Sequence, residues 1–145
     1  MSRRILQPLR LLALLPLALV ATGCSENNPF EPENPNAPTP TQVTETFSNT
    51  VSRNGAITFP FVANTGSIAA NLETVTPSDA TIGMALGEWN ATTELCQIRL
   101  ANDAATQGDT LLGAAQVTQN YCLRVYDATG QLSGPVTFTI NVQHF

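Results

Sequence analysis

Apolar and polar side chains alternate with a period of two along several short segments that follow residue 41. The cleanest segment is 136–143, in which one face carries Val136, Phe138, Ile140 and Val142 and the other carries Thr137, Thr139, Asn141 and Gln143. This alternation is typical of an antiparallel strand with one buried face. We expect this strand to bury its four apolar side chains and to end two residues before Phe145.

Five more segments alternate in the same way. Their apolar residues of one parity are Ile57, Phe59 and Phe61; Ile68, Ala70 and Leu72; Ile82, Met84 and Leu86; Cys96, Ile98 and Leu100; and Tyr121, Leu123 and Val125. The alternation is weaker at 43–51 and 111–117, and turns rich in Asn and Gly separate the segments. Pro60 predicts an edge strand or a bulge, because proline lacks the N–H that a sheet ladder needs.

These segments amount to seven or eight short strands, and no long 3.6-residue pattern accompanies them. They predict one all-β domain at residues 42–145. The expected architecture is an antiparallel β-sandwich of the jelly-roll or Greek-key kind.

Residues 1–23 have a different pattern. Basic residues precede the apolar run 11–21, which closes with small residues and Cys24. A basic, apolar and small order is typical of an export signal, and a cysteine at its end indicates a bacterial lipoprotein signal peptide. Cys24 is then the lipid-attachment residue, whose thiol carries a diacylglycerol and whose freed amine carries an acyl chain such as palmitate.

Two alternatives to this lipid anchor are an ordinary cleaved signal and a short retained anchor. A transmembrane helix needs about 20 apolar residues, whereas the run 11–21 is shorter and contains Pro16. Several acyl chains would hold the protein firmly, since a single chain binds only marginally. Ser25 stands where an aspartate would follow Cys24. By resemblance to known sorting rules this favours the outer membrane of the cell envelope, with the domain facing the periplasm or the cell surface.

Residues 24–41 are expected to form a disordered tether that begins at the lipidated cysteine. Five prolines stand among Asn and Glu from Ser25 to Thr41, with too few apolar residues to fold. A proline-rich chain extends by about 3.1 Å per residue, so the tether could reach on the order of 50 Å.

Charge excludes some classes of partner. Without the signal, three arginines stand against eleven Asp and Glu residues, a net charge of −8, and the chain contains no lysine. Nucleic-acid binding depends on basic side chains that neutralise phosphates. We therefore expect no nucleic-acid partner, and we expect membrane contact through the lipid alone.

The segments 82–87, 100–103 and 120–127 follow one another in an order that resembles the bacterial pre-peptidase C-terminal (PPC) domain. The Gly-x-Tyr-x-Leu-x-Val strand of that family looks like 119–125, with Gln119 in place of the glycine. Its closing Tyr-x-Leu-x-Val strand looks like 138–142, with Phe138 in place of the tyrosine. The resemblance covers about residues 44–143. It implies a jelly-roll-like sandwich that accompanies secreted enzymes and assists binding, secretion or stability, without being a peptidase itself.

Cys96 and Cys122 remain as a pair once Cys24 is lipidated, and export places them where disulfides persist. Strand parity opposes a simple pairing. In its own segment, Cys96 is on the same face as the alternating apolar residues. Cys122 is on the face opposite the alternating apolar residues of its segment. A disulfide between them therefore requires a bulge or an irregular strand start. The alternative is two separate thiols.

Candidates for catalysis are few. The single histidine, His144, is expected to be an exposed tail residue. Glu88 and Glu94 flank a turn, and a pair of carboxylates is what a glycosidase uses, but nothing in the sequence fixes their separation. We interpret both as solvated turn acids and expect no enzymatic activity.

Two further kinds of binding residue are candidates. Asn102, Asp103 and Asp109 bracket a loop and offer hard oxygen ligands that suit Ca²⁺. We interpret them instead as ordinary turn residues, and no cofactor is expected. Trp89 and Tyr126 lie near loops or on the outer face, where each could stack on a sugar or a protein side chain, or simply cap the sandwich.

The sequence therefore predicts a non-catalytic, membrane-anchored envelope lipoprotein that displays a β-sandwich as a binding or accessory module for an envelope protein or a glycan. The alternative is a small structural subunit that docks on a larger envelope complex by a sheet edge. A carboxylate-dependent hydrolase is the third possibility.

Overall fold

The computed structural model describes residues 40–145, so the predicted signal peptide, Cys24 and most of the predicted tether lie outside the described residues. Within residues 40–145, no helix has the length and apolar character that crossing a membrane requires. The elements are β1 (Val43–Val51), β2 (Ala56–Ala63), β3 (Gly66–Thr76), β4 (Ile82–Asn90), β5 (Leu95–Ala105), β6 (Thr110–Ala115), β7 (Gln119–Tyr126) and β8 (Val136–His144).

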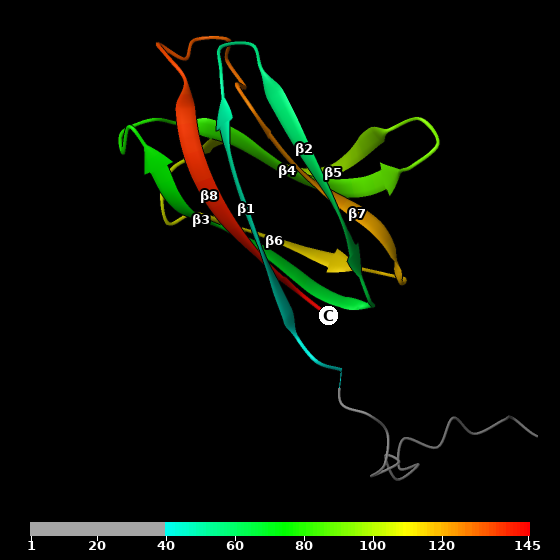
Figure 1. The fold of residues 1–145 in the computed structure, drawn as a ribbon. Helices are drawn as coiled ribbons and strands as arrows, with labels where there is room; N and C mark the ends of the chain where they lie inside the picture. The colour runs from blue at the N-terminus through cyan, green and yellow to red at the C-terminus, as the bar shows by residue number, and fades with distance from the viewer. Residues whose placement is uncertain (1–39) are drawn as a thin grey trace, which may run out of the picture. The chain divides into compact units, whose positions relative to one another are not determined.

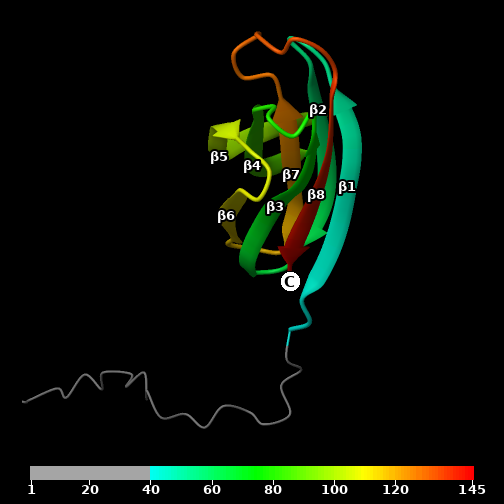
Figure 2. The same cartoon turned by 90° about the vertical axis from the view of Figure 1, so that its left-hand side faces the viewer.

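The eight strands form two four-stranded antiparallel sheets that pack face to face (Figures 1 and 2). One sheet, sheet A, has the order β1-β8-β3-β6, and the other, sheet B, has the order β2-β7-β4-β5. Consecutive strands lie in opposite sheets, except for β4 and β5, which pair as a hairpin within sheet B. This is the connectivity of a jelly roll. The predicted all-β sandwich is confirmed.

The core lies between the sheets. In β8, Val136, Phe138, Ile140 and Val142 are all buried, as their alternation predicts. In β3 the alternation shifts after Leu72, because a bulge between Leu72 and Thr74 turns Val75 inward. The bulge keeps the apolar face of this long strand on the core.

Aromatic rings close the side of the sandwich formed by the edge strands β1 and β2. The ring of Phe47 on β1 stacks on that of Phe59 on β2 with centroids 5.0 Å apart, and Phe59 meets the edge of Phe138 at 6.2 Å. Pro60 lies on β2, which is an edge strand, so its missing N–H costs the sheet no interior ladder bond.

The expectation that His144 is an exposed tail residue is wrong, because this residue is buried. The strand β8 extends to His144, whose side chain points inward like that of Val142 and is 4% exposed. Its Nε2 lies 3.0 Å from a carboxylate oxygen of Glu45, and its ring packs on that of Phe61. The partner on β1 satisfies the buried imidazole, which is why a polar residue ends the apolar face.

Candidate functional site

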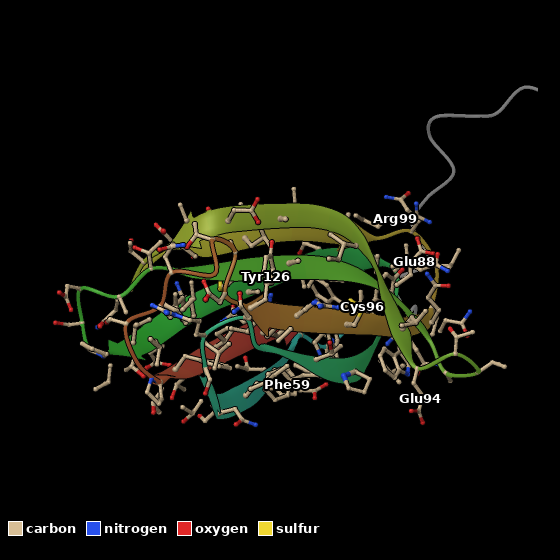
Figure 3. All side chains as sticks on the ribbon, turned by 90° about the horizontal axis from the view of Figure 1, so that it is seen from above. Phe59, Glu88, Glu94, Cys96, Arg99 and Tyr126 are labelled. Carbon is tan, nitrogen blue, oxygen red and sulfur yellow. A yellow bond between two sulfur atoms is a disulfide. The ribbon has the colours of Figure 1, made fainter. Side chains whose placement is uncertain are left out.

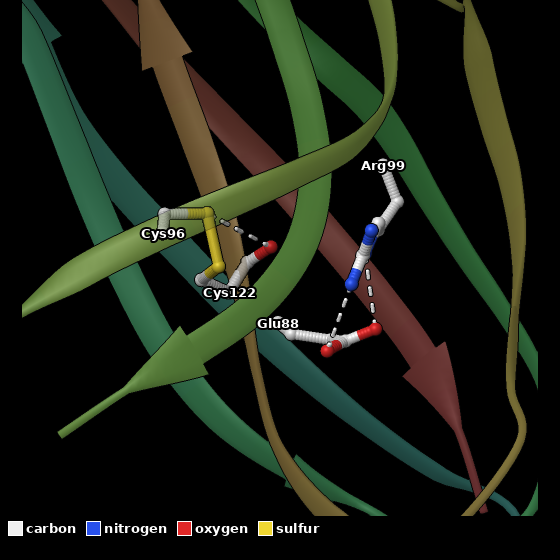
Figure 4. Close-up of a disulfide and its surroundings, with 4 residues drawn as sticks. All are labelled: Glu88, Cys96, Arg99 and Cys122. Carbon is white, nitrogen blue, oxygen red and sulfur yellow. Dashed lines mark hydrogen bonds and ion pairs between the residues drawn. A yellow bond between two sulfur atoms is a disulfide. The ribbon is translucent and has the colours of Figure 1, made fainter.

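The disulfide between Cys96 and Cys122 is present and joins strands that are not neighbours. Cys96 lies on β5 and Cys122 on β7, while β4 runs between them in sheet B. Their Cα atoms are nevertheless only 5.8 Å apart. Figure 4 shows β5 passing across β4 to bring the two sulfur atoms together.

Gly87 allows this crossing. A Cβ at Gly87 would lie 2.7 Å from the carbonyl carbon of Gln97, so the β5 backbone occupies the space that a side chain would fill. The pairing of β4 with β5 shifts register between Leu86 and Gly87. Cys122 thus faces outward on β7, as its parity requires, and is buried by the overlying β5. The bulge that the sequence left open resolves the conflict of parity.

Tyr126 forms a second, non-covalent connection from β7 to β5 across β4. It is paired with Gly83 of β4, and its ring covers the position where a Gly83 side chain would stand, with Cζ 2.7 Å from an added Cβ. Its hydroxyl donates a hydrogen bond to Asp103 on β5. Burial and the bond to the Asp103 carboxylate raise the pKa of Tyr126 to about 12, against a smaller opposing effect of Arg124. Tyr126 therefore stabilises the sheet rather than presenting a free ring.

The three calcium candidates are engaged in separate local contacts. The side chain of Asn102 accepts a hydrogen bond from the Ala104 N–H at 3.1 Å. Asp103 accepts the Tyr126 hydroxyl, and Asp109 accepts from the N–H and hydroxyl of Thr106 at 2.8 and 3.1 Å. The part of the chain that the structure describes contains no cluster of three or more His, Cys, Asp or Glu side chains. Asn102 and Asp103 thus lie within β5 and Asp109 orders the turn between β5 and β6, so each of the three has hydrogen-bond partners of its own.

Glu88 and Glu94 do not converge. Both carboxylate oxygens of Glu88 accept from the guanidinium of Arg99, at 3.1 and 3.3 Å, whereas Glu94 lies away from this pair (Figure 3). Glu94 occupies the left-handed region of the backbone, with φ of 53°, in the turn between β4 and β5. A carboxylate held in a bidentate ion pair is poorly placed to exchange protons with a substrate.

Trp89 stays available to a ligand. Its side chain is half-buried at the end of β4 and lines a hollow of about 290 Å³ together with Glu88, Asn90, Gln97 and Gln119. The Asn90 side chain accepts from the N–H groups of Thr92 and Thr93 and orders the adjoining turn.

Apolar side chains are exposed along β5 at the edge of sheet B. Leu95, Ile98 and Leu100 are 60%, 46% and 38% exposed, although the alternation of Ile98 and Leu100 predicts a buried face. A groove of about 90 Å³ beside this edge is lined by Leu86, Arg99, Leu100 and Tyr121, among others. We call this exposed row the β5 edge.

A larger cavity lies between two loops at one end of the sandwich. The connection from β3 to β4 and the loop from β7 to β8 enclose about 310 Å³. Residues lining this loop-end pocket include Asp79, Thr81, Thr129, Leu132, Ser133 and Pro135. The two loops are about 50 residues apart in sequence, so no local motif identifies the pocket.

The loop from β7 to β8 is held by Asp127. Its carboxylate accepts hydrogen bonds from the N–H groups of Asn54 at 3.0 Å, Gly130 at 2.9 Å and Leu132 at 3.3 Å. Partial desolvation acts to raise the pKa of Asp127, but these backbone donors outweigh it and the pKa is lowered. The Nε of Arg53 also donates to the Leu132 carbonyl at 2.9 Å. The pocket wall is therefore ordered before any ligand arrives.

Comparison with known proteins identifies a similar fold and no family. No protein-family model matches the chain, and no curated protein matches it either. Among solved structures, PliG from Aeromonas hydrophila, a periplasmic inhibitor of g-type lysozyme, is similar with a TM-score of 0.51. The match covers 68% of this chain and 83% of PliG at 15% sequence identity. At this identity the likeness concerns the fold alone.

Proposed function

We propose that the protein is a non-catalytic, lipid-anchored envelope lipoprotein whose β-sandwich binds a protein partner through its loop end. The observation that carries the proposal is the position of the chain's entry into the sandwich relative to the loop-end pocket. Val43 at the start of β1 is paired with His144, and Val51 with Val136, so the chain enters the domain at the end opposite the loop-end pocket. An anchor before residue 40 leaves that pocket accessible to partners.

The anchor in this proposal is acylated Cys24, which closes the apolar run of the signal. The serine that follows favours the outer membrane. A lipid at this position would hold the domain at the envelope through the proline-rich segment 25–41, without any membrane contact by the sandwich itself.

A protein partner is favoured by the likeness to PliG, whose name states that it inhibits g-type lysozyme in the periplasm. Our proposal extends from that protein only a protein-binding role on a similar sandwich. The acidic domain fits a basic partner, because residues 40–145 contain three arginines and eight Asp and Glu residues. The PPC resemblance is compatible with this role, since such domains assist other proteins.

A second candidate function is that of a small structural subunit docked on a larger envelope complex. The β5 edge favours it, since exposed Leu95, Ile98 and Leu100 line an edge strand, where another chain can pair. The two functions differ in which surface meets the partner.

Anchoring is tested by replacing Cys24 with Ala and separating membranes from soluble protein. We expect wild-type protein in the membrane fraction and the folded variant in the soluble envelope fraction. Mass spectrometry of the wild-type N-terminal peptide should find the acyl chains. A variant that stays on the membrane would contradict the lipid anchor.

Partner binding is tested by site-specific photo-crosslinking in intact cells. A photoreactive residue placed at Ser133 reports the loop end, one at Ile98 reports the β5 edge, and one at Thr139 on the outer face of sheet A is the control. We expect a protein adduct from Ser133 alone, identified by mass spectrometry. An adduct from Ile98 alone would support the structural subunit instead.

A further inference from the structure

The loop-end pocket combines one carboxylate with hydroxyl groups and apolar walls. Asp79 is the charged side chain among its lining residues, Thr81, Thr129 and Ser133 contribute hydroxyls, and Leu132 and Pro135 contribute apolar surface. Its volume of about 310 Å³ is that of a small ligand site. A mixed lining of this kind suits a long side chain that is apolar along its stem and polar at its tip.

The charges around the pocket indicate whether the polar end of such a side chain should be positive or negative. Asp127 and Arg53 both contact Leu132 from outside the cavity, and their opposite charges offset each other. Within residues 40–145, Asp79 forms no ion pair, and its side chain is exposed. The unbalanced charge at the pocket is therefore negative.

We propose that the loop-end pocket receives an arginine or lysine side chain of the partner protein, with Asp79 as its counter-ion. This inference rests on the proposed function, which supplies the partner. Leu132 and Pro135 would cover the aliphatic stem, and the hydroxyls would accept hydrogen bonds from the cationic head. Arginine fits best, because its planar group has five donors for a carboxylate and several hydroxyls.

The ordered loop strengthens such a site. A mobile loop would lose conformational freedom on binding and weaken the complex. Here the Asp127 carboxylate already fixes Gly130 and Leu132, and Arg53 fixes the Leu132 carbonyl. The walls need little further ordering when a side chain enters.

The test uses the soluble Cys24→Ala chain, labelled with ¹⁵N and titrated with N-acetyl-arginine methylamide in an NMR experiment. The neutral isostere N-acetyl-citrulline methylamide is the matched control ligand. We expect saturable shifts at millimolar arginine in the amides of Thr81, Thr129 and Ser133, reduced by 1 M salt, and none with citrulline. Equal shifts with citrulline, or shifts elsewhere only, would overturn the inference.

Asp79→Asn should weaken arginine binding about fivefold, as expected for an exposed ion pair. Glu94→Gln removes an exposed carboxylate from another turn and should leave binding unchanged. An unaltered affinity in Asp79→Asn, with a native spectrum, would also overturn the inference. The outcomes separate the two proposals: crosslinking at Ser133 without arginine binding refutes the basic side chain alone. Arginine binding without any adduct refutes the proposed function alone.

Discussion

The outer faces of the two sheets are stabilised in different ways. On sheet A, exposed side chains pair between neighbouring strands, as in Thr46 with Asn141 at 2.7 Å and Ser48 with Thr139 at 3.0 Å. On sheet B, β5 and β7 are joined across β4, once by a disulfide and once by Tyr126 with Asp103. The residues below these connections are Gly87 and Gly83.

This difference predicts a difference in tolerance to substitution. A pair between adjacent strands on a solvated face contributes little and can be replaced. A connection that passes over an intervening strand requires both its partners and the glycine beneath it. We therefore expect sheet B to be sensitive at few positions and sheet A to be tolerant at many.

The largest effect is expected from removing the disulfide. A Cys96→Ala, Cys122→Ala variant loses a covalent link across 26 residues of sequence, which is worth about 3.5 kcal/mol in the chain-entropy description. Urea unfolding of the soluble Cys24→Ala chain with and without these substitutions measures it. Wild-type protein treated with reductant should match the double variant. A loss under 1 kcal/mol would show that crossing strands, rather than the disulfide, hold this face.

A slightly smaller effect is expected from Gly87→Ala. The added methyl would meet the Gln97 backbone, which moves only if β5 is lifted, so we expect a loss of about 2–3 kcal/mol in unfolding free energy. Gly134→Ala is the matched control, because a Cβ there meets nothing within 4 Å. Equal stability of the two variants would contradict the close crossing of β5 over β4.

Tyr126→Phe should cost about 1 kcal/mol, the usual net value of one hydrogen bond. The same contact gives a pH signature. Its pKa of about 12 lies above the ordinary value of 10.0, so folding favours the neutral phenol. The stabilisation is complete below pH 10 and is lost as pH rises through about 12.

Phenolate absorbance measures this directly in a Tyr121→Phe background, because the chain has two tyrosines and no lysine. Asp103→Asn should move the transition from about 12 back toward 10.0. A transition that stays near 12 in Asp103→Asn would leave burial as the sole cause of the shift.

The smallest effect is expected on sheet A. Thr139→Val removes the hydrogen bond to Ser48 while keeping a β-branched side chain, and the change should stay within about 0.5 kcal/mol. Denaturation midpoints against wild type measure it. A loss as large as that of Gly87→Ala would remove the distinction between the two faces.

The same difference between the sheets explains why the alternation of apolar residues predicted the buried side chains of sheet A better than those of sheet B. Sheet A has one buried and one solvated face, so the alternation in β8 predicted its buried residues correctly. Sheet B is covered on both faces along β4, where six consecutive residues from Ile82 to Gly87 are buried, and period-two alternation carries less information there. In β5, the register shift places Ile98, the partner of Gly87, on the opposite face from Leu100, the partner of Leu86. The alternation over 96–100 therefore did not predict which residues are buried, and both side chains are partly exposed at this edge strand.

The candidate sites were less predictable than the fold. The cysteine pair was identified from its count and compartment, but the crossing at Gly87 depends on three strands at once. The outward position of Tyr126 leaves a ligand-stacking role and a structural role open from sequence, because its bond to Asp103 depends on the path of β5. Asp79 and Ser133 both line the loop-end pocket, but they lie on different loops that share no sequence pattern.

The strand order also sets the order in which the two sheets can form when the chain folds from its N-terminus. Sheet B uses β2, β4, β5 and β7, so all its strands and both cysteines precede residue 127. Sheet A waits for β8, since β1 has β8 as its one neighbour and Val43 pairs with His144. The disulfide-bearing half can thus close first, whereas the first strand stays unpaired until the last has been delivered.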